Sequence, residues 1–375
     1  MRTRGGYRIR PYKGVPLTIL RRRFAAGLFT LCLLLTCFGV SGCGGYQRYR
    51  AEFSDVFDTH TVMLVYARSA AESNKYAQIV HDRMKALNAL FDIYNAYDGL
   101  NNLYTVNQNA GVAPVKVDKD LIGLLKAAVA GYDATDGAVN VALGAVLSIW
   151  HDYRAAGTAD PENAKLPPMA ELRAADQVTD IRDVVINERD STVFLTKKGM
   201  SLDVGSVAKP YAAALAVWDA VAAGMTSALL DTGGSTTIAV GEPMDGARDS
   251  WSVGIQDPDL ALDGTQNLMD TIALTAGETL SCSGGYVRFY TVDKVRYSHI
   301  IDPVTLLPPT LYKQVAVICP DAVQANLLST ALFILPYEQG LQLVQNAGAD
   351  ALWLFADGHT EMTDGYRALS NTYHA

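Results

Sequence analysis

Apolar residues recur at helical spacing in several segments of the chain. Within residues 70–95, Ile79, Met84, Leu87 and Phe91 fall near one face of a 3.6-residue repeat, which predicts a long amphipathic helix. The same pattern predicts further helices at residues 119–131, 139–151, 321–335 and 337–346. The third of these begins at Asp321, a residue type that caps helix N-termini, and is also expected to be amphipathic.

Segments rich in β-branched and aromatic residues predict strands that meet at tight turns. Residues 183–188 and 191–196 form one such hairpin, and the turn Gly233-Gly234 separates another pair of strands. Further strands are expected at residues 60–67, 251–255, 270–275, 286–291, 294–297, 314–320, 351–355 and 359–362. Runs of strands with segregated helices favour an α+β fold with mixed or antiparallel sheets over a doubly wound parallel sheet.

The N-terminus has the pattern of a bacterial export signal. Residues 1–23 carry eight basic residues and no acidic one, and an apolar stretch follows from Phe24 to Val40. The next residues, Ser41-Gly42-Cys43, resemble a lipobox, which predicts cleavage before Cys43 and lipidation of its thiol. A plain transmembrane anchor is the alternative, and the apolar stretch is short for it.

This leader divides the chain into three parts. Residues 1–42 are the expected signal peptide, residues 43–56 a polar tether, and residues 57–375 one catalytic or binding domain. Residues 152–183 of that domain are expected to be irregular. The predicted location is the extracytoplasmic side of a cell membrane, with the protein held there by a lipid anchor.

Composition narrows the classes of partner. The full chain has a net charge of −8. The mature chain is still more negative, because all charged residues of the leader are basic. Such a balance disfavours nucleic-acid binding. Of the five cysteines, only Cys282 and Cys319 lie beyond Cys43, too few for a disulfide scaffold.

The segment 201–215, SLDVGSVAKPYAAAL, contains the most suggestive turn. Ser206 and Lys209 have the Ser-x-x-Lys spacing of acylating serine enzymes, but the chain has no Ser-Asp-Asn and no Lys-Thr-Gly or Lys-Ser-Gly partner element. A second interpretation is an anion site, because Asp203, Gly205 and Lys209 surround free amides at a helix N-terminus. An ordinary strand-to-helix corner with Ser206 as N-cap is the third.

Five separated segments decide between these interpretations. They are residues 135–154 (TDGAVNVALGAVLSIWHDYR), 229–241 (LLDTGGSTTIAVG), 251–259 (WSVGIQDPD), 296–308 (RYSHIIDPVTLLP) and 315–333 (VAVICPDAVQANLLSTALF). In this order and spacing the chain resembles the ApbE family, the FAD:protein FMN transferases, from about Phe57 to its C-terminus. The resemblance implies transfer of FMN from FAD to a threonine of a partner protein, with release of AMP and with Mg²⁺ on the diphosphate.

The resemblance also implies site residues. The FAD contacts carry over onto Tyr97, the backbone of Ala138, Val139 and Asn140, and onto Asp203, Lys209 and Ile300. His299 takes the position of the general base, on a predicted strand, since a neutral imidazole suits proton transfer near pH 7. The implied acceptor is an electron-transport subunit with an FMN-binding domain.

The metal positions depart from the family pattern. They fall on Ser206, through its carbonyl, and on Asn326 and Thr330, where the family has an aspartate in place of Asn326. An amide oxygen is neutral and Mg²⁺ prefers a carboxylate. The alternative function is therefore an FAD-binding lipoprotein with weak or no transferase activity.

Cys43→Ser should abolish lipidation, because a hydroxyl cannot replace the thiol that carries the lipid. The variant is expected either to leave the membrane fraction or to keep its uncleaved leader. Membrane partition and the mass of the purified protein measure both results. An unchanged partition together with an unchanged mass would contradict lipidation at this residue.

Overall fold

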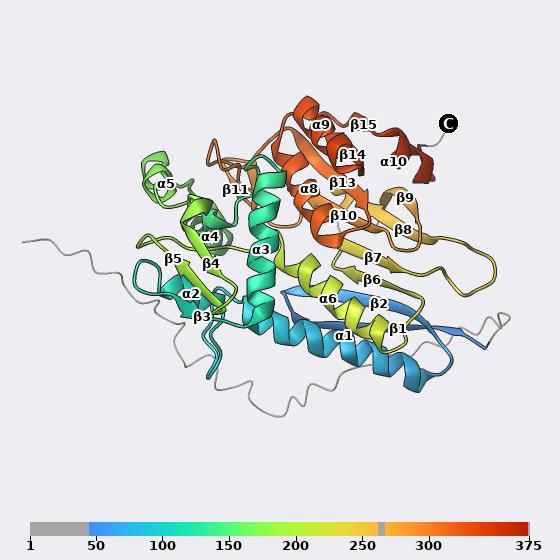
Figure 1. Ribbon diagram of the computed structural model, residues 1–375. Helices are drawn as coiled ribbons and strands as arrows, with labels where there is room; N and C mark the ends of the chain where they lie inside the picture. The colour runs from blue at the N-terminus through green and yellow to red at the C-terminus, as the bar shows by residue number, and fades with distance from the viewer. Residues whose placement is uncertain (1–44, 262–266, 374–375) are drawn as a thin grey trace, which may run out of the picture. The chain divides into compact units, whose positions relative to one another are not determined.

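An eight-stranded antiparallel sheet organises the fold in the computed structural model, which describes residues 45–261 and 267–373 (Figure 1). Its strand order is β1-β2-β6-β7-β10-β13-β14-β15. These strands are β1 (Gln47–Val56), β2 (Thr59–Ala67), β6 (Ala228–Thr232), β7 (Thr236–Val240), β10 (Thr279–Gly284), β13 (Tyr312–Cys319), β14 (Asp350–Phe355) and β15 (Thr360–Met362). The structure combines helices with sheets whose strands pair antiparallel throughout, which confirms the predicted α+β class.

Three smaller sheets surround the main one, and all are antiparallel. They consist of β3 (Val115–Lys116), β5 (Thr192–Leu195) and β4 (Val184–Asn187); β8 (Trp251–Gln256) and β9 (Leu268–Leu274); and β11 (Phe289–Val292) and β12 (Val295–Ser298). The predicted hairpins at 183–196 and 286–297 are thereby confirmed. At the β6–β7 turn, Gly233 and Gly234 have φ values of 69° and 70°, a left-handed conformation that glycine adopts without strain.

All five helices predicted from the hydrophobic pattern are present, and others, including those at residues 103–108 and 364–369, were not predicted. They are α1 (Ala70–Phe91), α2 (Leu103–Gln108), α3 (Lys119–Ala134), α4 (Gly144–Ala159), α5 (Met169–Asp176), α6 (Ala208–Ala222), α7 (Pro258–Ala261), α8 (Ala322–Ile334), α9 (Tyr337–Ala347) and α10 (Asp364–Leu369). Asp321 caps α8, since its carboxylate accepts a hydrogen bond from the Gln324 amide at 2.9 Å. None of the helices in the described ranges is long and apolar enough to cross a membrane.

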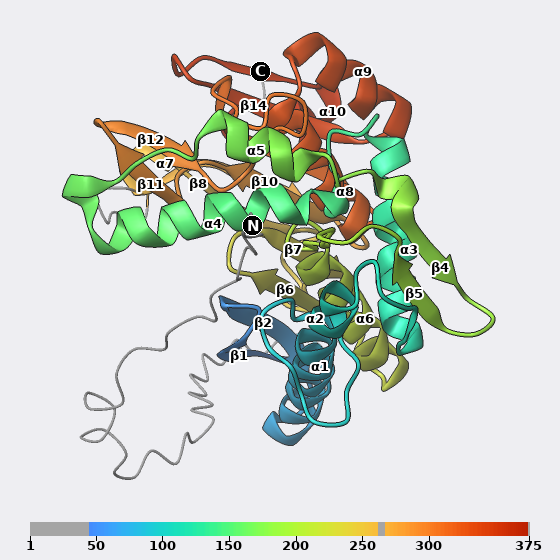
Figure 2. The same cartoon turned by 90° about the vertical axis from the view of Figure 1, so that its left-hand side faces the viewer.

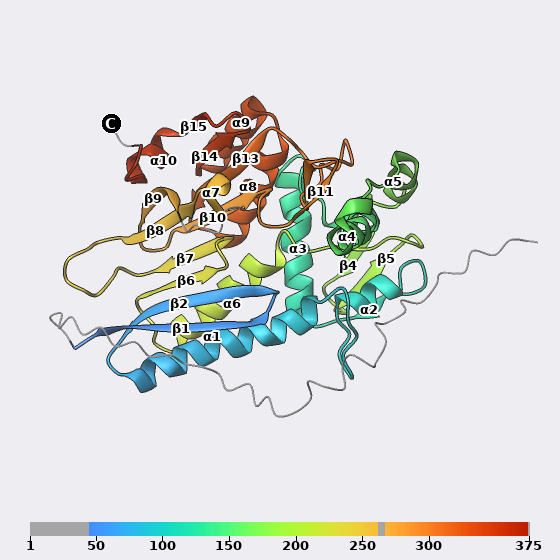
Figure 3. The same ribbon diagram turned by 180° about the vertical axis from the view of Figure 1, so that it is seen from behind.

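The main sheet is buried on both faces because different elements cover each one. On β13, Val315 and Val317 pack with α8 and α9, whereas Ala316 and Ile318 pack with β8, β9 and α10. The two-residue period of a strand places these pairs on opposite faces. Helices α1 and α6 lie side by side along β1, β2 and β6 (Figures 1 and 3).

Helix α8 is buried around nearly its whole circumference, contrary to the expected amphipathic helix. Its side chains pack against β10 and β13 and also against α3, α6 and α9. Ala325, Leu328 and Phe333 are apolar members of this packing, and Asn326 and Ser329 are its polar members. A helix enclosed on all sides needs no polar face, so the alternation expected of a surface helix does not apply here.

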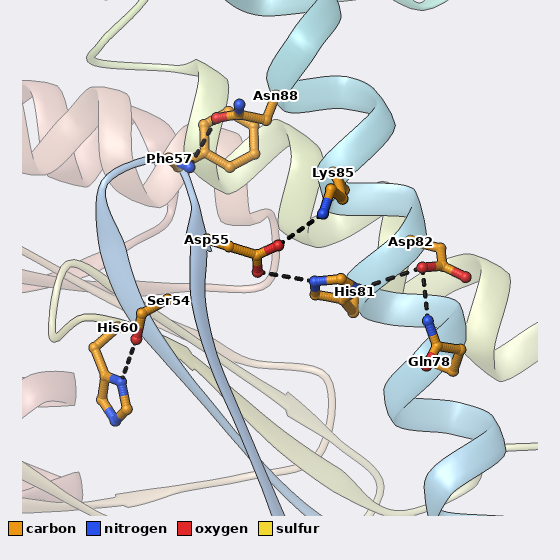
Figure 4. A network of polar contacts seen from close by, with 9 residues as sticks. All are labelled: Ser54, Asp55, Phe57, His60, Gln78, His81, Asp82, Lys85 and Asn88. Carbon is orange, nitrogen blue, oxygen red and sulfur yellow. Dashed lines mark hydrogen bonds and ion pairs between the residues drawn. The ribbon is translucent and has the colours of Figure 1, made fainter. Parts of the chain in front are cut away.

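Residues 47–56 form strand β1 rather than the expected polar tether, so the sheet begins at Gln47. Tyr49, Ala51 and Phe53 point into the core, while the intervening Arg48 and Arg50 are exposed. The end of β1 is tied to α1, because the Asp55 carboxylate accepts hydrogen bonds from His81 Nε2 at 2.8 Å and Lys85 Nζ at 2.9 Å (Figure 4). Next along the chain, the Phe57 amide donates to Asn88 Oδ1 at 2.7 Å. Cys43 and the leader lie outside the described residues.

The region 152–183, expected to be irregular, contains the end of α4 and all of α5, which lie side by side (Figure 2). Helix α4 continues to Ala159 because Trp150 anchors it. The Trp150 indole is buried against Tyr290 of β11, and its Nε1 donates to the Leu306 carbonyl at 2.9 Å. This contact spans distant parts of the chain and leaves no local sequence pattern.

Phe333→Ala should lower the free energy of unfolding by about 3–5 kcal/mol, because the side chain is 1% exposed and its loss leaves a cavity under the sheet. Urea denaturation of both proteins measures this difference. Trp218→Ala is the control: that indole on α6 is 66% exposed, and its removal should change stability by less than about 0.5 kcal/mol. Equal losses for the two variants would show that α8 is not the buried helix described here.

Candidate functional site

Two turns from different parts of the chain meet at the start of α6. The Asp203 amide donates to the Val141 carbonyl at 2.8 Å, which joins the turn 201–207 to the turn 138–143. The Asn107 side chain holds the same turn, because it both donates to the carbonyl and accepts from the amide of Leu202. Helix α6 begins at Ala208 after Val207, and Ser206 makes no side-chain cap, so the plain-corner interpretation with Ser206 as N-cap is wrong.

The turn 138–140 lies beside a cavity of about 480 Å³. Ala138 and Val139 are buried, and Asn140 is fixed by two bonds of its side chain, one to the Ala142 amide and one to the Thr179 carbonyl. Ala138 and Asn140 line the cavity together with residues 302–304, which are distant in sequence. The backbone expected to contact a ligand is therefore held rigidly at the edge of a hollow.

Cations gather around Asp203. Arg154 of α4, Arg288 just before β11 and Lys209 of α6 act on one another or on Asp203 electrostatically. In the described ranges none of the three forms an ion pair with a carboxylate; the Arg154 guanidinium donates instead to His151 Nδ1 at 3.1 Å. Three cations around one carboxylate, Asp203, leave an excess of positive charge, which suits an anionic ligand.

The pKa shifts of these groups have the same origin. Burial, and then the charge of Arg288, lower the pKa of Lys209 to about 8, so the ammonium remains largely protonated at pH 7. Burial, and then the charge of Arg288, likewise lowers the pKa of Arg154. Burial raises the pKa of Asp203, against the opposing effects of the Gly205 amide and the nearby cations. The site is thus partly dehydrated, which strengthens electrostatic interactions within it.

His299 lies directly after β12, at a bend, rather than on a strand as expected. Its amide and its Nδ1 both lie near the Arg288 carbonyl oxygen, at 3.0 and 3.1 Å. Because a carbonyl can only accept, Nδ1 carries the proton and Nε2 keeps its lone pair. Burial, and then the charges of Arg288 and Arg154, lower the pKa of His299 to about 4. The imidazole is therefore neutral at pH 7, with Nε2 available as a base.

The two remaining predicted FAD contacts differ in their setting. Ile300 follows His299, packs against the α8–β13 core and accepts a hydrogen bond from Ser298 Oγ at 3.3 Å. Tyr97 is 39% exposed in the loop after α1, and its hydroxyl donates to Asp92 at 2.9 Å. Burial, and then the bond to Asp92, raises the pKa of Tyr97. Tyr94 lies three residues earlier, and burial and then the charge of Asp203 raise its pKa. Its ring is tilted against the His151 ring, with centroids 5.6 Å apart.

The three predicted metal positions lie together where α8 passes the turn before α6. Asn326 Nδ2 donates to the Ser206 carbonyl at 2.9 Å, and Thr330 Oγ1 donates to the Asn326 carbonyl at 3.0 Å. Within the described part of the chain, no group of three or more His, Cys, Asp or Glu side chains is placed to hold a metal ion.

Comparisons with known proteins agree with this architecture. Residues 34–353 match the sequence profile of the ApbE family. The chain belongs to the ApbE family. An FAD:protein FMN transferase of Treponema pallidum is 33% identical over 89% of this chain and 92% of its own length. One from Klebsiella pneumoniae is 27% identical over 73% of this chain and 83% of its own.

Solved structures of the family have the same fold. The ApbE protein of Thermotoga maritima superposes with a TM-score of 0.74 at 26% identity, covering 86% of this chain and 99% of that one. The apo form of the flavinyl transferase ApbE of Pseudomonas stutzeri gives a TM-score of 0.71 at 22% identity, covering 88% and 98%. The ApbE-like fold expected from the sequence is confirmed.

The sequence interpretation missed several residues that the structure brings to this ApbE site. They are Tyr94, His151, Arg154 and Arg288. His151 and Arg154 lie at the end of segment 135–154. Two polar residues within a family motif were therefore the available signal. Arg288 lies outside all five segments, and only the fold brings it to Lys209 and His299.

Arg288→Gln should raise the pKa of His299 from about 4 toward the ordinary value of 6.5, because the variant keeps the Arg288 backbone carbonyl and removes the positive charge. In the wild type, the stability contributed by neutral His299 is complete above pH 6.5 and is lost as the pH falls toward 4; the variant should lose less over this range. An NMR titration of the His299 ring measures the pKa directly. Arg296→Gln is the control, since that guanidinium lies over the Phe289 ring. An equal shift in both variants would contradict a specific effect of Arg288.

Proposed function

We propose that this chain is an FAD:protein FMN transferase. The observation that carries the proposal is the His299 ring, which is held neutral with Nε2 free beside a group of unneutralised cations. A base next to positive charge suits attack of a hydroxyl on a phosphate ester or anhydride. Membership of the ApbE family and the names of its relatives in Treponema and Klebsiella support the same reaction.

The reaction joins a threonine of the acceptor protein to the FMN phosphate of FAD. The threonine oxygen attacks that phosphorus, the bond from phosphorus to the bridging oxygen breaks, and AMP leaves with the bridging oxygen. His299 Nε2 takes the hydroxyl proton. The flavin half of FAD is assigned to the backbone at Ala138–Asn140, to Asp203 and Ile300, and to Tyr97. Lys209, Arg288 and Arg154 are assigned to the negative charge of the diphosphate, which suits cations that form no direct ion pair within residues 45–261 and 267–373.

Mg²⁺, which the family resemblance implies, does not fit the residues present. Ser206 offers a carbonyl, Asn326 an amide and Thr330 a hydroxyl, all neutral, whereas a resident Mg²⁺ favours at least one carboxylate. The Asn326 N–H also points at the carbonyl that would bind the ion. No step of the proposed reaction is therefore assigned to a metal held by these residues.

The acceptor and the location complete the proposal. An electron-transport subunit with an FMN-binding domain is the acceptor that the family implies, and a lipid at Cys43 would hold the transferase at the membrane where such subunits reside. The alternative, an FAD-binding lipoprotein without transferase activity, is favoured by one observation. Asn326 occupies the position at which the family has its metal carboxylate.

His299→Ala should bind FAD nearly as the wild type does and transfer FMN roughly 10²–10⁴-fold more slowly, because a hydroxyl needs a positioned base at neutral pH. FAD binding is measured by fluorescence titration, and transfer by the mass increase of a threonine-bearing acceptor domain. His359→Ala is the control, since that imidazole pairs with Asp357 at the exposed β14–β15 turn.

Three outcomes would count against the proposal. Equal transfer rates for His299→Ala and the wild type would show that the base lies elsewhere. Loss of FAD binding together with activity would make His299 a binding residue. If the wild type binds FAD but transfers to no acceptor, the alternative function replaces the proposed one.

A further inference from the structure

Asn326 joins two segments that are far apart in sequence. Its side chain is buried, at 6% exposure, in the second turn of α8. Nδ2 donates to the Ser206 carbonyl at 2.9 Å, and Oδ1 accepts from Thr236 Oγ1 of β7 at 3.3 Å. The amide therefore links the turn before α6 to the main sheet through α8.

The chemistry of the partners determines which way this amide points. The Ser206 carbonyl can only accept, so it requires the N–H end of Asn326. The Thr236 hydroxyl can donate or accept, and it meets the oxygen end as a donor. A reversed amide would place two carbonyl oxygens against each other in a buried site, which is costly because neither can donate.

The groups hydrogen-bonded next to the amide are hydroxyls and backbone carbonyls. Ser281 Oγ lies 3.4 Å from Thr236 Oγ1 and donates to the Ser235 carbonyl at 2.9 Å. Ser329 Oγ and Thr330 Oγ1 each donate to the backbone carbonyl of Asn326 at 3.0 Å. These hydroxyls bond to one another and to backbone carbonyls, and none of the bonded groups named here is an anion that a cation would neutralise.

A divalent cation would join the same atoms in a different way. A carboxylate at position 326 and the Ser206 carbonyl would both present oxygen, and two such oxygens attract one another only through a positive ion between them. The N–H of Asn326 supplies that positive end from within the side chain. One covalent group thus makes the connection that otherwise needs an acid and a metal.

We propose that the Asn326 amide is a built-in replacement for a divalent cation at the junction of α6 and α8, and that this protein holds the junction closed without Mg²⁺. Asn326 is a positioning residue in this arrangement: it fixes the turn 203–207, and with it Lys209, relative to the sheet. The inference concerns the folded chain alone and does not depend on transferase activity.

Asn326→Asp tests the inference, with thermal unfolding of the full-length protein in detergent as the readout and no FAD or acceptor present. The carboxylate removes the N–H and faces the Ser206 carbonyl with negative charge. In EDTA the variant should melt several degrees below the wild type, and millimolar MgCl₂ should restore most of the difference. The wild type should melt at the same temperature in EDTA and in MgCl₂.

Asn326→Ala is the matched control, because it removes the same hydrogen bond without adding a ligand. It should melt below the wild type in both solutions and gain nothing from MgCl₂. If Asn326→Asp gains no more from MgCl₂ than Asn326→Ala, position 326 is not at a latent cation site and the inference fails.

The wild type and Asn326→Ala together also test the inference if the aspartate variant does not fold. Isothermal titration of MgCl₂ into the wild type should show no saturable heat of binding that depends on Asn326, and a parallel titration of Asn326→Ala checks this dependence. A heat of binding that the wild type shows and Asn326→Ala lacks would overturn the inference. So would a melting temperature that MgCl₂ raises in the wild type but not in Asn326→Ala. Because neither measurement contains FAD, failure of the transferase assay leaves both results unaffected.

Discussion

The burial of α8 is the constraint on which the position of the site depends. This apolar helix packs on β10 and β13 and is enclosed by α3, α6 and α9, so its rotation about its own axis is set by the fit of its side chains. A rotation by one residue would carry Asn326 about 100° away from the turn at Ser206. The hydrophobic core thus directs the Asn326 side chain toward the turn before α6, which Val141 and Asn107 hold from the other side.

Unbalanced charge is the second feature that distinguishes this region. Several other arginines and lysines pair with neighbouring carboxylates, as Arg182 does with Asp180 and Arg248 with Asp245. At the site, Arg154, Arg288 and Lys209 share their surroundings with one another and with His299, and burial makes this repulsion more costly. A fold keeps such an arrangement when a ligand repays the cost on binding.

The local sequence pattern was enough to predict the elements whose ends are marked by capping or turn residues. The cap at Asp321, the Gly233-Gly234 turn and the hairpin at 289–298 were recognisable from neighbouring residues alone. Strand β1 was missed although Tyr49, Ala51 and Phe53 alternate with polar residues, because the many charges of the segment outweighed its two-residue period. Arg288 and Tyr94 could not be found in this way, since only tertiary contacts bring them to Asp203.

The early start of β1 sets how far the folded domain could lie from a lipid at Cys43. From Cys43 to Gln47 there are four residue steps, and a chain extends by at most about 3.6 Å per residue, so the link spans roughly 15 Å. For a chain held by a lipid at Cys43, the first strand of the sheet stays within that distance of the bilayer surface. With such an anchor, the short link would give the molecule little freedom to move away from the bilayer, and a large partner would have to present its acceptor segment close to the membrane plane.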